Sequence, residues 1–213
     1  MDQTQYNQQV TALRERIEKL YAERGQKALF HGIHHIRFVA HKAREFAEAL
    51  QANSFLCESA ALVHDINYLI EQNSAPERGV ELRKQILSEC QYSPLDQEAI
   101  ENIILEEHTG NRGKNISKEA MALSDADTLF KALPITPILF TGKYIQENSV
   151  DIKQLAHKII TEQRPLFDAG IYFYTDSARE RYLKWAQTNL ELWENVYESL
   201  SDLDVQRLLS DMV

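Results

Sequence analysis

The sequence predicts an all-α fold, a compact helical array without a β-sheet. Only 7 glycines and 5 prolines punctuate its 213 residues. No segment shows the sustained alternation of β-branched and polar residues that is typical of half-buried strands. Apolar residues instead recur at spacings of three and four, which places them on one face of an α-helix.

Breaks rich in glycine, proline, asparagine and serine separate the expected helices. The helices are predicted at 3–24, 33–51, 53–70, 77–90, 95–108, 117–131, 135–147, 150–163, 176–199 and 201–211. None of the breaks is long enough to link independent domains, so we expect a single domain over 1–213.

Composition excludes several classes of protein. A net charge of −9 argues against binding of extended nucleic acid. No run of 18 apolar residues and no basic, apolar leader is present in the sequence, so we expect neither a membrane span nor a secretory signal. Cys57 and Cys90 stand apart, as in a reducing, cytoplasmic protein.

In the helix expected at 33–51, seven apolar residues define one buried face: Ile36, Val39, Ala40, Ala43, Phe46, Ala47 and Leu50. His35 lies at the edge of that face, whereas His34 and His41 project to the outer side and are expected on the surface. His35 is therefore either a metal ligand or a core histidine bonded to a backbone carbonyl.

The helix expected at 53–70 is apolar nearly all round, which is typical of a helix at the centre of a bundle. His64 and Asp65 follow its apolar run and therefore lie near the interior. A buried carboxylate is unfavourable unless it is paired or binds a metal. The alternative is a helix-terminal histidine followed by a capping aspartate.

The helix expected at 95–108 places Ile100, Ile104 and His108 at intervals of four, so His108 should continue a buried stripe. It is either an active-site residue or a histidine that the helix dipole favours.

In the helix expected at 117–131, Asp127 shares the inward face with Leu123 and Phe130. Asp125 points about 200° away from that face. We expect Asp125 to be a supporting or surface group whose removal leaves metal binding and activity largely intact.

His35, His64, Asp65 and Asp127 together offer two imidazoles and two carboxylates. Such mixed ligands suit one divalent ion, Mn²⁺, Fe²⁺, Co²⁺, Ni²⁺, Zn²⁺ or, less well, Mg²⁺. On a six-coordinate ion they would leave two positions open, as in a catalytic site.

This pattern resembles the HD superfamily of metal-dependent phosphohydrolases, whose motifs run H…HD…D. Three stretches carry the likeness: His35-Ile36-Arg37-Phe38-Val39, Leu62-Val63-His64-Asp65-Ile66 and Ser124-Asp125-Ala126-Asp127-Thr128-Leu129. The resemblance covers about 31–145, and the helical C-terminal part at 150–211 is compatible with it. Members with two metals usually carry an extra histidine where this chain has Ser74-Ala75-Pro76, which favours one ion.

The resemblance implies hydrolysis of a phosphoester or phosphoanhydride, in a nucleotide or another small phosphorylated metabolite, by a metal-activated water. Asp65 and His108 are the catalytic candidates, with His108 protonating the leaving oxygen or stabilising charge on the phosphoryl group. Lys143, Arg78 and His31 are the candidate substrate contacts; each has an alternative role, as a solvated base or a loop histidine.

Two other functions stay open at this point. One is a regulatory domain that binds metal or nucleotide without turnover. The other is an interaction protein whose polar residues only satisfy a helical core. The sequence also leaves open a homo-oligomer.

Overall fold

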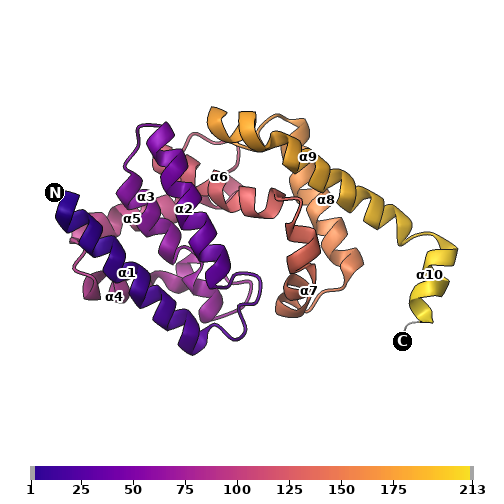
Figure 1. Cartoon of the computed structure of the whole chain (residues 1–213), viewed down its shortest axis with the longest axis horizontal. Helices are drawn as coiled ribbons and strands as arrows, with labels where there is room; N and C mark the ends of the chain where they lie inside the picture. Colours follow the sequence, from indigo (N-terminus) through magenta and orange to yellow (C-terminus); the bar gives the residue numbers. More distant parts are fainter. Residues whose placement is uncertain (1–2, 212–213) are drawn as a thin grey trace.

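The computed structural model describes residues 3–211, which are helical without a strand, as the sequence predicts. Figure 1 shows the elements in order. The α-helices are α1 (Gln3–Arg24), α2 (Ile33–Ala49), α3 (Ser54–Val63), α4 (Val80–Glu89), α5 (Pro94–Glu107), α6 (Lys118–Ala132), α7 (Thr136–Asn148), α8 (Ile152–Asp168), α9 (Asp176–Ser199) and α10 (Leu203–Ser210). Short 3₁₀ turns are η1 (Ile66–Leu69), η2 (Pro76–Gly79) and η3 (Thr109–Asn111).

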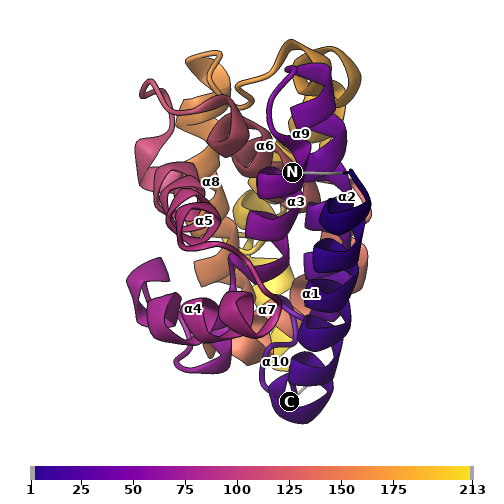
Figure 2. The same cartoon turned by 90° about the vertical axis from the view of Figure 1, so that its left-hand side faces the viewer.

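Helix α2 packs most extensively against α3 and α6, and these three helices carry the residues of interest. In Figure 1, α1 to α5 lie on the left, α6 crosses the middle, and α7 to α9 lie on the right; Figure 2 shows α1, α4 and α5 from the side. One apolar core runs from Val10 in α1 to Leu190 in α9. The central helices are thereby fixed relative to one another.

Side-chain caps set the starts of these helices. The side chains of Asn53, Ser93 and Ser117 accept hydrogen bonds from backbone amides in the first turns of α3, α5 and α6. Such bonds satisfy amides that have no partner inside the helix.

The structure differs from the prediction of one helix over 53–70. α3 ends at Val63 and the backbone leaves the helical conformation at Asp65, with φ −97° and ψ 15°, before the η1 turn. In α8, by contrast, the helix continues past the predicted end at 163 and includes Pro165. Pro165 lies on the exposed side, where water can bond to the carbonyl that loses its amide partner.

Cys57 and Cys90 are free and buried, as expected of small apolar side chains. Within residues 3–211, no helix has the length and apolar character needed to span a bilayer.

Candidate metal centre

His35 reaches the centre of the molecule from the first turn of α2. Its side chain is completely buried, together with Ile36 and Val39 on the face that the helical phase predicted. Its Nε2 points toward the end of α3, where it lies 3.3 Å from Nε2 of His64.

His64 and Asp65 converge because the helix stops between them. Neighbouring residues on a continuous helix point about 100° apart, whereas here Asp65 has already left the helix. Nδ1 of His64 donates a hydrogen bond to the Ala61 carbonyl at 2.8 Å. This bond fixes the tautomer and leaves the lone pair on Nε2 free for a metal.

Asp127 approaches from α6, one turn before Lys131. Its Oδ2 accepts a hydrogen bond from Nζ of Lys131 at 2.5 Å, while its Oδ1 lies 3.5 Å from Nε2 of His35. One carboxylate oxygen is thus held by the lysine and the other faces the histidines. Lys131 orients the carboxylate in the way that outer partners orient metal ligands.

Three of the predicted donors, from His35, His64 and Asp127, lie within 4.8 Å of one another, and Asp65 approaches the two histidines. Two atoms bound at about 2.1 Å lie about 3.0 Å apart at neighbouring corners of an octahedron and about 3.4 Å apart in a tetrahedron. Oδ2 of Asp65 is 3.1 Å from Nε2 of both His35 and His64. That oxygen is buried and has no hydrogen-bond donor of acceptable geometry among the described residues. The donor set therefore fits a metal ion.

Negative charge dominates the centre. Burial disfavours the protonated imidazole of His64, but the carboxylates of Asp65 and Asp127 outweigh burial and raise its pKa to about 9. Burial and the Asp127 carboxylate raise the pKa of Glu107 to about 7. The centre thus attracts positive charge, and a divalent ion would displace protons when it binds.

Comparison with known proteins identifies the family. Residues 32–131 of this chain match the HD domain. This matched segment includes all four predicted ligands. No curated protein matches the sequence significantly.

Solved structures of low sequence identity share the fold. Bacillus subtilis YpgQ in complex with ADP has a TM-score of 0.68 at 20% identity, covering 94% of this chain and 99% of that one. A second crystal structure of Bacillus subtilis YpgQ has a TM-score of 0.66 at 20% identity, covering 92% of this chain and 97% of that one. A Lactobacillus plantarum protein has a TM-score of 0.66 at 21% identity, with 90% and 94% covered.

A cleft of about 420 Å³ lies near the candidate metal centre, although none of the four predicted ligands is among its described lining residues. Its lining residues are Tyr68, Asn73, Ser74, Ala75, His108, Tyr144, Asn148, Val150, Gln154, Leu155 and Lys158. Tyr68 links the cleft to the centre through His31, whose ring stacks on Tyr68 and meets the ring of His35. The cleft lies between the η1 and η2 segment and helices α7 and α8.

His31 lies in the segment before α2, but it is buried rather than solvated as a surface loop histidine would be. Its ring stacks on Tyr68 with the centroids 3.9 Å apart, and it meets His35 edge-on at 5.7 Å. Nδ1 of His31 is hydrogen-bonded to Oε1 of Glu147 from α7. Glu147 also accepts hydrogen bonds from the backbone amides of Phe30, at 2.7 Å, and His31, at 3.3 Å.

The other predicted site residues occupy different surroundings. His108 follows the last residue of α5 and is exposed, so the prediction that it continues a buried stripe is wrong. The backbone has left the helical conformation there, with φ −49° and ψ 137°, and Nδ1 of His108 accepts a hydrogen bond from the Gly110 amide. Arg78 is exposed and pairs with Glu71. Lys143 is exposed on α7, with Nζ 5.1 Å from the centre of the Phe140 ring. His108 lines the cleft, whereas Arg78 and Lys143 are not among its described lining residues.

Asp125 is completely buried, so the alternative of an outward surface group is wrong; the alternative of a supporting group, and the expected effect of its removal on metal binding, stay predictions. It accepts hydrogen bonds from the amides of Tyr174, at 2.8 Å, and Thr175, at 2.7 Å, and pairs with Arg112 at 3.2 Å. Helix α6 packs against α2, α3 and α5 and also against α9, so its outer side is covered as well. Asp125 joins α6 to the start of α9.

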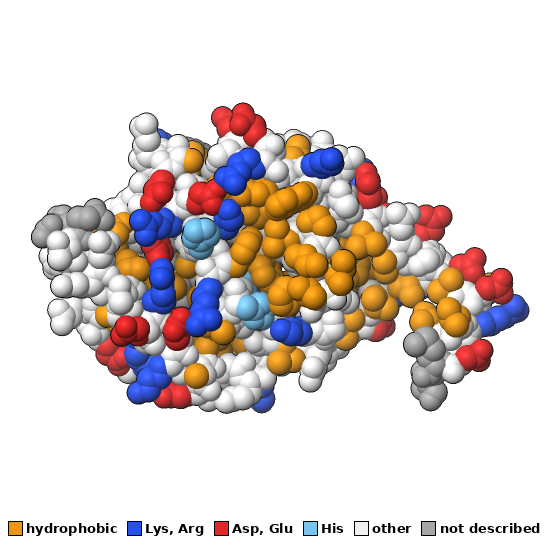
Figure 3. Space-filling model, in the orientation of Figure 1, with side chains coloured by type: hydrophobic (Ala, Val, Ile, Leu, Met, Phe, Trp, Pro, Cys, Tyr) orange, Lys and Arg blue, Asp and Glu red, His pale blue; other side chains and the backbone are white. Residues whose placement is uncertain are grey.

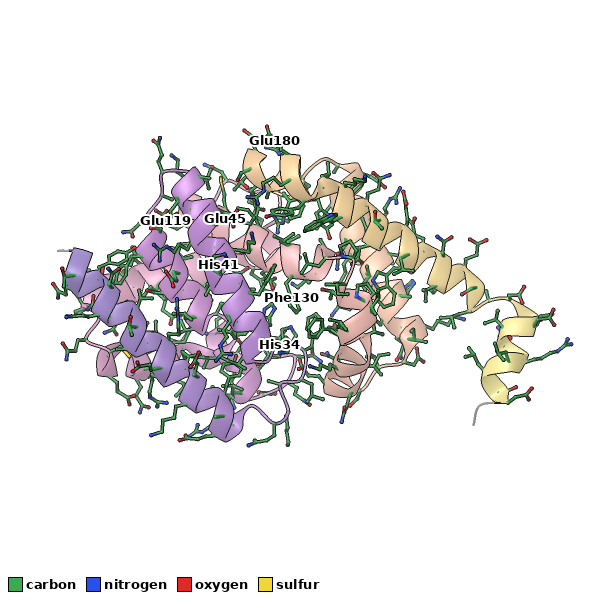
Figure 4. All side chains as sticks on the ribbon, viewed as in Figure 1. His34, His41, Glu45, Glu119, Phe130 and Glu180 are labelled. Atoms are coloured by element: carbon green, nitrogen blue, oxygen red, sulfur yellow. The ribbon has the colours of Figure 1, made fainter. Side chains whose placement is uncertain are left out.

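His34 also departs from the surface position expected of it. It stacks on Phe140 of α7 with centroids 4.8 Å apart, and Figure 4 shows it beside Phe130 in the space between α2 and α7. His41 is exposed on α2, as predicted.

Sequence reasoning missed Lys131, Glu107, Tyr68 and Lys158 as neighbours of the centre and cleft. Lys131 follows Asp127 by four residues, so helical spacing carried a signal for it. Tyr68 and Lys158 had no such signal, because the cleft forms between segments that are distant in sequence.

We expect purified protein to carry, or be stabilised by, about one equivalent of a divalent transition metal. Binding to the folded state alone raises stability, by about 2.7 kcal/mol when the ion is present at 100 times its Kd. Elemental analysis measures the metal content, and thermal shifts with Mn²⁺, Co²⁺, Ni²⁺ and Zn²⁺ measure the stabilisation. Absence of metal together with unchanged melting temperatures would contradict the proposed centre.

Proposed function

We propose that this protein is a metal-dependent phosphohydrolase that acts on a nucleotide or another small phosphorylated metabolite. The observation that carries the proposal is the convergence of His35, His64 and Asp127, with Oδ2 of Asp65 3.1 Å from Nε2 of both histidines, near an open cleft. A divalent ion held there would polarise a phosphoryl oxygen and lower the pKa of a bound water. Asp65, whose Oδ2 lies 3.1 Å from Nε2 of both histidines, would help to hold that ion.

The cleft has the chemistry that a nucleotide requires. Tyr68 and Tyr144 offer aromatic surfaces on which a base can stack, an interaction worth about 1–3 kcal/mol. Lys158 offers a positive charge for a phosphate, and Nδ2 of Asn148 and the hydroxyl of Ser74 add polar groups. The structure of YpgQ with ADP supports this choice of substrate class by fold analogy.

We assign different roles to the residues around the cleft. His108 at its rim donates a proton to the leaving oxygen. His31, held by Glu147 and stacked on Tyr68, keeps one wall in place beside the metal centre. Lys158 replaces Lys143 and Arg78 as the proposed phosphate contact, since it lines the cleft.

A screen of nucleotides and phosphomonoesters with several divalent metals tests the function. Hydrolysis by the wild type, but not by a variant unable to hold metal, supports the proposal. Binding of metal and nucleotide without turnover of any substrate would contradict it and indicate a regulatory HD domain.

The replacement His108→Ala is expected to keep the metal and lower kcat by about 10²–10⁴-fold, the usual contribution of a general acid. The measurement is metal content beside kcat on the same preparation. The matched control is His157→Ala, which removes an exposed histidine of α8 that is not among the described lining residues. Loss of metal in proportion to activity would instead make His108 a ligand.

A further inference from the structure

Helix α10 presents an apolar face to solvent. Val205, Leu208 and Leu209 follow one another at spacings of three and one, which places them on the same side of the helix. None of the described α10 side chains is buried, and Leu208 is 61% exposed. In Figure 1, α10 lies beyond the end of α9, away from α7.

A helix of this length needs a partner. Isolated helices shorter than about 12–15 residues are marginal in water, and most helical stability in proteins comes from packing of an apolar face. α10 has 8 residues and begins at a good cap, since the Asp202 side chain accepts from the amides of Asp204 and Val205. The cap favours the start of the helix, but contacts of its apolar face with another surface are needed to stabilise it.

The same chain carries an uncovered apolar surface, which we call the α7/α9 patch. It consists of Ile135, Ile138, Leu139, Trp185 and Leu192, of which Ile138 is 75% and Leu139 58% exposed. Figure 3 shows hydrophobic side chains gathered over this part of the molecule. The adjoining Phe140 is fixed by ring contacts with Phe130 and His34, so the surface beneath the patch is rigid.

The sizes of the two surfaces match what a dimer requires. Side chains exposed to this extent present on the order of 500 Å², at the upper end for a monomer. A stable dimer buries about 800 Å² on each partner. The exposed leucines on the apolar face of α10 add to this area, so patch and helix together approach the area of a stable interface while neither does alone.

Charge is also complementary. The segment around α10 carries Asp202, Asp204 and Asp211 against the single cation Arg207. Lys143, which stands over the Phe140 ring at the edge of the patch, is exposed and positive. An ion pair with these aspartates would give Lys143 a role outside the cleft.

We propose that two copies of this chain exchange α10, so that each α10 lays its apolar face on the α7/α9 patch of the other copy. The exchange is reciprocal and closes as a symmetric dimer, which leaves neither surface exposed. It removes from water two apolar surfaces that the single chain leaves uncovered.

Sedimentation of the full chain with its metal tests the exchange. The arm variant Leu208→Ser/Leu209→Ser and the patch variant Ile138→Ser/Leu139→Ser should each weaken dimerisation at least about 100-fold, with unchanged metal content. The matched control is Leu95→Ser, which alters a leucine of α5 that is 78% exposed but belongs to neither surface. A monomeric wild type at high micromolar concentration, or a dimer that both variants leave intact, would overturn the proposal.

Mixing the two variants identifies the contact. A dimer of one arm variant and one patch variant retains one intact contact between α10 and the patch, so mixing should restore part of the association. Packing of patch against patch would give no such recovery and would overturn the exchange. Hydrogen exchange supplies a second readout, because α10 amides should be protected in the dimer and lose protection on dilution. Protection of α10 in a monomer would show that it packs on its own chain instead, which also overturns the exchange.

Discussion

Replacing Asp127 with alanine is expected to abolish both metal retention and activity. Oδ1 of Asp127 lies 3.5 Å from Nε2 of His35, and loss of this oxygen would remove one of the four proposed ligands and one of the charges that favour a cation. Nζ of Lys131 would then stand beside the centre without its partner, which further disfavours a cation. The fall in metal affinity should exceed the 10–100-fold that loss of an outer partner typically causes.

Two further variants serve as comparisons for Asp127→Ala. Lys131→Met removes the group that orients Asp127 but keeps the ligand, so affinity should fall only by about 10–100-fold. Asp168→Ala removes an exposed aspartate that pairs with Arg164 at the same four-residue spacing, and it should leave metal binding unchanged. The measurements are metal titration and turnover. Equal losses from Lys131→Met and Asp127→Ala would show that Asp127 acts through the ion pair and not as a ligand.

Replacing Asp125 with alanine is expected to destabilise the fold by about 3–5 kcal/mol, the usual effect of removing one partner of a buried ion pair. The Arg112 guanidinium, whose side chain is 3% exposed, would be left buried beside two backbone amides that lose their acceptor. For a chain of this size the change corresponds to a melting temperature lower by roughly 6–20 °C. Thermal unfolding followed by circular dichroism measures it.

The second variant Arg112→Met, added to Asp125→Ala, should recover part of the loss because it removes the unpaired charge. Asp168→Ala is again the control, and as an exposed pair it should change stability by no more than about 1 kcal/mol. A melting temperature of Asp125→Ala equal to that of the wild type would contradict the buried role of this carboxylate.

Asp127 and Asp125 show which buried positions helical phase can predict and which it cannot. Phase places Asp127 on the inward face of α6 because it depends only on residues within the same helix. It fails for Asp125 because it assumes a single buried face, whereas α9 covers the other side of α6. The amides that bond to Asp125 lie 49 and 50 residues away, and Arg112 lies 13 residues away outside the helix, where no local pattern points to them.

The break after α3 limited prediction in a different way. The apolar run predicts a central helix correctly, but it does not predict that the helix ends at Val63. That end is what allows His64 and Asp65, adjacent in sequence, to face the same point. His31 and Glu147 are separated by 116 residues, so their pairing depends on how the helices assemble.

Glu147 makes the family's characteristic core depend on helices outside it. The matched segment 32–131 begins after His31 and ends before α7, so neither member of that pair belongs to it. Yet the Glu147 carboxylate holds the peptide that enters α2, and α2 begins two residues before the ligand His35. The entry to α2 in this protein is thus held from outside the HD segment, so local opening of α7 would release the peptide before His35, and any affinity for metal would then report on the integrity of the C-terminal helices.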